Sequence, residues 1–108
     1  MASTKPPNQD GVNRLVRATV LHVVAPLMVN GKVISTPDEM DPGWKLGMPA
    51  PIGMDDQRLH LLVIHLNLLV KSLKPKASFS PSDIKAGDDI AALQTTVWGK
   101  VKPASRAP

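Results

Sequence analysis

The 108-residue sequence contains no cysteine, and only 3% of its residues are aromatic. Without cysteine the chain has no disulfide bonds, thiolate metal ligands or thiol nucleophiles, and such a composition is typical of a reducing compartment. The aromatic side chains, Trp44, Phe79 and Trp98, are too few for a platform on which single-stranded nucleic acid stacks its bases. The chain must therefore build its core without disulfides, and its length is sufficient for that in a single domain.

Long hydrophobic runs are missing as well. No apolar stretch reaches the ~18 residues that cross a bilayer, and residues 1–10 lack the apolar segment of a signal peptide. We therefore expect a soluble, cytoplasmic protein that makes no contact with membranes.

Proline, in contrast, is abundant, and its 11 residues mark the boundaries of segments. Most lie near the two chain ends, between residues 37 and 51, or around residues 75–81, which leaves three stretches for regular structure. This distribution predicts a disordered segment over residues 1–10, a single helical domain over 11–101 and a flexible tail over 102–108. Pro26 is the exception, because it lies inside an apolar segment.

That apolar segment predicts the first helix. Apolar residues recur at steps of three and four from Val12 to Leu27, after a possible N-terminal cap at Asp10. Pro26 should kink or end the helix, and Asn30-Gly31 should stop it. The same residues also suit a β-hairpin, because Asn-Gly favours a type I′ turn and valine favours strands. The helix is preferred here, since its spacing continues over more residues than a hairpin requires.

The strongest helical pattern extends from Asp55 to Leu73. Either Asp55 or Asp56 can cap its start, and Lys74-Pro75 should end it. Its main apolar stripe consists of Leu59, Leu62, Val63, Leu66, Leu69, Val70 and Leu73. Three further apolar residues, Leu61, Ile64 and Leu68, lie roughly opposite that stripe. A helix that is apolar nearly all round is either buried centrally or covered by a partner.

A long connection joins these two helices over residues 31–54, with four prolines and four glycines. Loops of this length in a compact domain usually have a function or are disordered. Trp44 and Met48 indicate that the connection is not simply a solvated linker. It either folds back over the core as a lid or presents these two side chains to a partner.

The last third of the chain predicts a short helix over residues 80–86 and a final helix that starts at Asp88 or Asp89 and ends at Trp98-Gly99. The predicted fold class is therefore all-α, a small helical domain of two long helices, a long connecting loop, one short helix and a final helix. An α+β fold with a hairpin at Asn30-Gly31 is the alternative.

Nothing in the sequence indicates a catalytic, metal or cofactor site. His60 and His65 are five residues apart, so they diverge on a helix and do not form a ligand pair. The pairs Asp55-Asp56 and Asp88-Asp89 stand at predicted helix starts, where capping explains them. The sequence has no phosphate-binding loop, dinucleotide fingerprint, nucleophile elbow or zinc-protease motif. We expect no enzymatic activity and no cofactor.

The formal net charge of +4 combines two unequal regions. Residues 31–56 carry five acids against two lysines, whereas residues 57–79 carry four cations and no acid. Lys71, Lys74 and Lys76 form a basic surface near the end of the second helix, where the helix dipole also favours cations. Binding of nucleic acid through phosphate contacts with these lysines is one possible function.

The helix order and one short motif resemble those of acyl and peptidyl carrier proteins, over roughly residues 11–100. The sequence Gly53-Met54-Asp55-Asp56 is similar to the Gly-x-Asp-Ser turn with which the second carrier helix opens. In the carriers this serine takes phosphopantetheine, but here Asp56 stands in its place, and Gln57 replaces the leucine that follows. The resemblance therefore implies a carrier-like fold without the prosthetic group.

Together these patterns favour a non-catalytic protein-interaction module. Its predicted binding residues are Leu61, Ile64 and Leu68 on the second helix, with Trp44 and Met48 in the connection. The partner is either another protein or a second copy of the chain in a homodimer. A carrier-like domain without phosphopantetheine and a basic nucleic-acid-binding protein are the alternatives.

Overall fold

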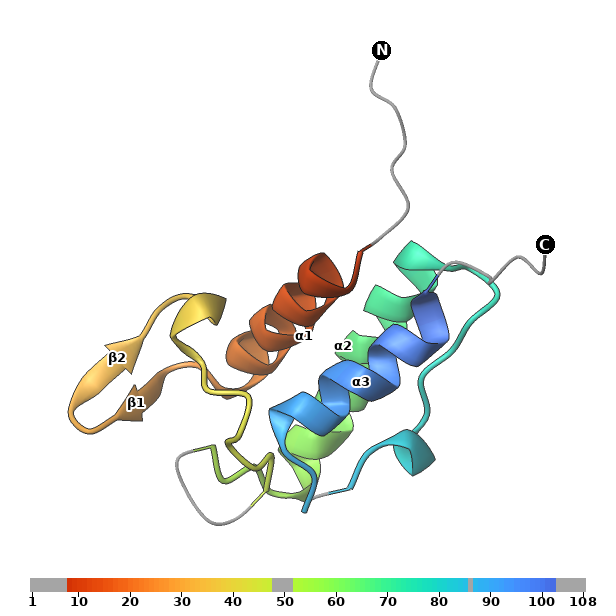
Figure 1. The fold of residues 1–108 in the computed structure, drawn as a ribbon. Helices are drawn as coiled ribbons and strands as arrows, with labels where there is room; N and C mark the ends of the chain where they lie inside the picture. The colour runs from red at the N-terminus through yellow and green to blue at the C-terminus, as the bar shows by residue number, and fades with distance from the viewer. Residues whose placement is uncertain (1–7, 48–51, 86, 103–108) are drawn as a thin grey trace.

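The structure is a computed structural model that describes residues 8–47, 52–85 and 87–102 (Figure 1). Within these ranges the chain forms three α-helices and one two-stranded sheet. The α-helices are α1 (Gln9–Val24), α2 (Asp56–Leu73) and α3 (Ile90–Val101), the strands are β1 (Leu27–Val29) and β2 (Lys32–Ile34), and two 3-10 helices are η1 (Pro37–Glu39) and η2 (Pro81–Asp83). The predicted helical domain is confirmed in outline, but a strictly all-α fold is wrong because of the sheet.

Helix α1 begins earlier than the sequence pattern predicted. The side chain of Asn8, not that of Asp10, caps it by accepting a hydrogen bond of 2.7 Å from the Gly11 amide. Gln9 and Asp10 are therefore helical, although they fall in the segment predicted to be disordered. The remainder of that segment, up to residue 7, and residues 103–108 of the predicted tail lie outside the described residues.

The segment after α1 is a β-hairpin, so the preferred extension of the helix to Gly31 is wrong and the alternative is correct. Helix α1 ends at Val24 because a proline at position 26 disfavours helical backbone at the residue before it. Asn30 and Gly31 both have positive φ, 53° and 79°, as a type I′ turn requires. The pairing joins Leu27 with Ile34, Met28 with Val33, and Val29 with Lys32.

The described part of the long connection folds back over the helices as a lid. Met40, Leu46, Ile52 and Met54 are all buried in the core. The Leu46 amide donates to the Asp88 carbonyl at 2.9 Å, and the Ile90 amide donates to the Trp44 carbonyl at 3.0 Å. These bonds attach the lid to the start of α3, which satisfies backbone groups that burial would otherwise leave unpaired.

Both later helices start at an aspartate cap. Asp55 accepts a hydrogen bond from the Arg58 amide at 2.8 Å, and Asp89 accepts one from the Ala92 amide at the same distance. Helix α3 continues to Val101, beyond the end predicted at Trp98-Gly99. The short helix predicted over 80–86 is only the 3-10 turn η2, in which Ser80 and Asp83 hydrogen-bond reciprocally.

Helix α1 packs against both other helices and holds the fold together. Figure 1 shows α2 and α3 running in the same general direction, opposite to α1. Residues 74–85 and 87–89, which we call the return segment, lead back along the bundle from the end of α2 to the start of α3. The core consists mainly of aliphatic side chains from all three helices, the hairpin and the lid. Arg17 of α1 links three elements, since it donates to the side chain of buried Gln94 at 2.8 Å and to the Pro37 carbonyl at 3.1 Å.

The turn after the hairpin should make stability depend on pH through Glu39. The Glu39 carboxylate accepts hydrogen bonds from the Ser35 and Thr36 amides and pairs with Lys32 at 3.1 Å. These contacts, the Ser35 bond foremost, lower the pKa of Glu39 from 4.5 to about 2. Because the folded pKa is the lower one, the stabilisation is complete above pH 4.5 and is lost as the pH falls through 2.

Thermal unfolding of Glu39→Gln should therefore occur at a lower Tm than that of the wild type at neutral pH, and this difference should disappear near pH 2. Asp10→Asn is the control, because it removes the same charge from an exposed position on α1. Tm measured by circular dichroism across this pH range gives both curves. Identical pH profiles for the two variants would contradict the role assigned to Glu39.

Candidate protein-interaction surface

Helix α2 has two apolar sides, and only one of them is buried. Leu62, Leu66 and Val70 face the core and are inaccessible to solvent. On the other side, Leu61, Ile64 and Leu68 retain 45%, 44% and 61% of their accessible surface. Their spacing of three and then four residues aligns them along the helix axis. We call these three residues the α2 stripe.

The elements beside α2 flank this stripe without covering it. On one side lies α1, and the Arg58 guanidinium donates a hydrogen bond to the Val23 carbonyl. On the same side the rings of His22 and His65 pack edge to face, with their centroids 5.2 Å apart. On the other side the return segment is held by Asn67, whose side chain accepts a hydrogen bond of 2.9 Å from the Phe79 amide. The stripe is thus an open apolar ridge between two anchored neighbours.

Charges are distributed unevenly around α2. Among the described residues, the ion pairs join Arg14 and Arg17 to Asp38, Lys32 to Glu39, and Lys100 to Asp83. Two acids of the connection, Asp38 and Glu39, are thus paired with cations of α1 and the hairpin. The predicted basic surface of Lys71, Lys74 and Lys76 has no such ion pair within the described ranges, and Asp56 at the start of α2 has none either.

The two predicted binding residues of the connection do not join the stripe. Trp44 is half-buried and packs against the core beside the start of α3, where its carbonyl accepts the hydrogen bond from Ile90. Met48 lies outside the described residues. The candidate surface is consequently formed by Leu61, Ile64 and Leu68, the residues that the excess of apolar side chains on one helix indicated.

The structure exposes further apolar side chains that the sequence reasoning missed. Met28 and Val33 face each other across the hairpin and are 58% and 51% exposed. Once Asn30-Gly31 is accepted as a hairpin turn, strand alternation places this pair opposite the buried Leu27 and Ile34. The contact between His22 and His65 was also missed, because no sequence pattern brings together two histidines on separate helices.

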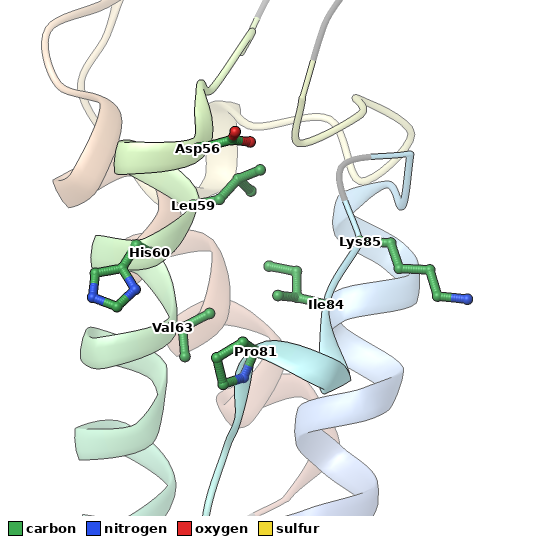
Figure 2. Close-up of a pocket in the computed structure, with 7 residues that line it drawn as sticks. All are labelled: Asp56, Leu59, His60, Val63, Pro81, Ile84 and Lys85. Atoms are coloured by element: carbon green, nitrogen blue, oxygen red, sulfur yellow. The ribbon is translucent and has the colours of Figure 1, made fainter.

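A cavity of about 220 Å³ lies between α2 and the return segment. Figure 2 shows Leu59, Val63, Pro81 and Ile84 facing one another across it. The ring of His60 points away from this gap, the Lys85 ammonium points outward, and Asp56 lies at the edge. Since the polar groups diverge instead of converging on one point, the cavity has the character of an apolar notch and offers no arrangement for acid–base chemistry.

Two further properties concern metals and membranes. In residues 8–47, 52–85 and 87–102, no three His, Asp or Glu side chains gather closely enough to bind a metal ion. No helix in the part of the chain that the structure describes is long and apolar enough to span a membrane.

Comparison with known proteins finds no matching family model, no similar curated protein and no similar solved structure. The resemblance to carrier proteins therefore stays a prediction. The residue in the position of their modified serine, Asp56, is the first residue of α2 and is exposed.

Proposed function

We propose that this protein is a non-catalytic interaction module that binds a helix of a partner protein through the α2 stripe. The observation that carries the proposal is the exposure of Leu61, Ile64 and Leu68 in one line on a helix whose other side forms the core. Single exposed aliphatic residues are ordinary on protein surfaces, but an aligned set at helical spacing is the pattern with which a helix docks onto a partner.

The surroundings of the stripe support a protein partner. Each stripe residue keeps nearly half of its surface or more accessible, so a second helix laid along α2 would remove apolar area from water. The neighbouring Asn67 and Lys71 are held by contacts with the return segment. A surface that is already ordered loses little conformational entropy on binding.

A photo-crosslinking experiment tests this function. A benzophenone amino acid placed at Leu68 in cells that produce the protein should form crosslinks to a peptide of another polypeptide, identified by mass spectrometry. The same amino acid at Thr95, an exposed position of α3, is the matched control. Ile64→Lys should abolish the crosslinks from position 68, because it places a charge in the centre of the apolar line.

The proposal fails if position 68 gives no more crosslinks than position 95, or if Ile64→Lys leaves the crosslinks unchanged. Crosslinking to a second copy of the chain and crosslinking to a different protein both support a protein-binding surface. The first result would identify the partner as a second copy of this chain, and the second would identify it as another protein.

A further inference from the structure

We propose that the partner on the α2 stripe is a second copy of this chain, bound so that the two α2 helices run antiparallel across a two-fold axis near Ile64. This inference rests on the proposed function and names its partner. It draws on the spacing of residues along the solvent side of α2, the distribution of charge between its two ends, and the exposure of the stripe, which no element of the described part of the chain covers.

The spacing makes the stripe self-complementary. A two-fold axis at Ile64 places that residue against its own copy and Leu61 against the partner subunit's Leu68. Gln57 and Lys71 continue the same three-and-four spacing at the two ends, each seven residues from Ile64. An interface with three apolar residues in the middle and polar residues at both ends fits its own copy, in the manner of a short coiled coil.

Charge selects the antiparallel direction. Helix α2 begins with Asp56 and carries Lys71 and Lys74 at its other end. Across the proposed axis, Asp56 lies at the level of the partner subunit's Lys71 and Lys74, and the same pairing recurs at the other end. A parallel pair would instead align aspartate with aspartate and lysine with lysine. None of these three side chains is in an ion pair with another described residue. The Lys71 ammonium donates a hydrogen bond to the Ala77 carbonyl at 3.4 Å and keeps further N–H donors for a carboxylate.

The size of the stripe sets the expected affinity. Three partly exposed side chains per subunit form an interface at the small end of the known range, so we expect a Kd on the order of 10 µM. Sedimentation equilibrium of the full chain from about 1 µM to about 500 µM, which brackets this Kd, should show conversion from monomer to dimer. Ile64→Lys should raise the Kd at least about 100-fold, because it buries two like charges at the axis. Thr95→Lys, on an exposed part of α3, is the matched control and should leave the Kd unchanged.

Because the chain has no cysteine, introduced cysteines report the orientation directly. Mixing a Gln57→Cys chain with a Lys71→Cys chain under mild oxidation should yield the mixed disulfide in excess over either homodimer. Dominant Gln57→Cys homodimers would show a parallel pair and overturn the proposed geometry. Thr95→Cys provides the background rate of disulfide formation between exposed cysteines.

Charge reversal gives a second test of the same geometry. Asp56→Lys alone should weaken the dimer by about 3- to 10-fold, as expected for a partly exposed ion pair. The triple variant Asp56→Lys, Lys71→Asp and Lys74→Asp should recover most of that loss, since both members of each pair are exchanged. Circular dichroism of each variant verifies that the helices are intact.

A wild-type chain that remains monomeric at the highest concentration overturns the homodimer. If position 68 nevertheless crosslinks to a different protein, the interaction function stands with another partner. If neither dimer nor crosslink is found, both proposals fail.

Discussion

Leu66→Ala should lower the free energy of unfolding by about 2–5 kcal/mol, whereas Leu68→Ala, only two residues further along α2, should change it by less than about 0.5 kcal/mol. Leu66 is fully buried, and the alanine would leave a cavity among side chains of the core. Leu68 is 61% exposed and leucine and alanine have similar helix propensities, so its truncation removes little.

Urea denaturation followed by circular dichroism measures both values. The experiment should be done at about 1 µM protein, where a dimer with a Kd on the order of 10 µM is mostly dissociated and does not add to stability. Equal losses for the two variants would show that the two apolar sides of α2 are buried alike, and the interaction surface would then have no basis. At high concentration Leu68→Ala should instead weaken dimerisation, which separates its role from that of Leu66.

The sequence separates a main apolar stripe of α2 from three apolar residues opposite it, but it leaves open whether the smaller side is covered within the chain or by a partner. Leu62 and Leu66 resemble Leu61 and Leu68 in every local property, including helix propensity and hydrophobicity. The difference arises because α1 and the return segment lie against particular sides of α2, through contacts such as those of Arg58 with Val23 and Asn67 with Phe79. Contacts between residues this far apart in the chain are not encoded in a helical period.

The hairpin shows a different limit of the periodicity argument. The valines before Pro26 repeat at helical spacing, and the repeat continues to Leu27, which lies in strand β1. Local backbone chemistry decides the outcome, because the proline ends the helix and the Asn30-Gly31 pair adopts the positive φ values of a tight turn. Both signals were visible in the sequence, and giving them precedence over the repeat would have predicted the hairpin.

Leu46→Ala should also lower the free energy of unfolding by about 2–5 kcal/mol, although Leu46 lies in a segment without regular structure. Its side chain is fully buried, as much as any leucine of α2. The backbone is held on both sides, since its amide donates to Asp88 and its carbonyl accepts a bond of 3.0 Å from the Met54 amide. With both groups fixed, the lid has little freedom to collapse into the cavity that the substitution leaves, and the loss should not be small.

Lys45→Ala is the matched control, because the neighbouring Lys45 is exposed and its ammonium donates a long hydrogen bond of 3.3 Å to the Gly87 carbonyl. Its effect should stay within about 0.5 kcal/mol, as for other surface substitutions. Hydrogen exchange gives an independent measure: the amides of Leu46 and Met54 should exchange as slowly as those in the middle of α2, through global unfolding alone. Fast exchange at both amides, or a loss below about 1 kcal/mol for Leu46→Ala, would mean that the lid opens independently of the helices. Trp44 and the start of α3 would then be accessible to a partner, and the α2 stripe would have a competitor as the binding surface.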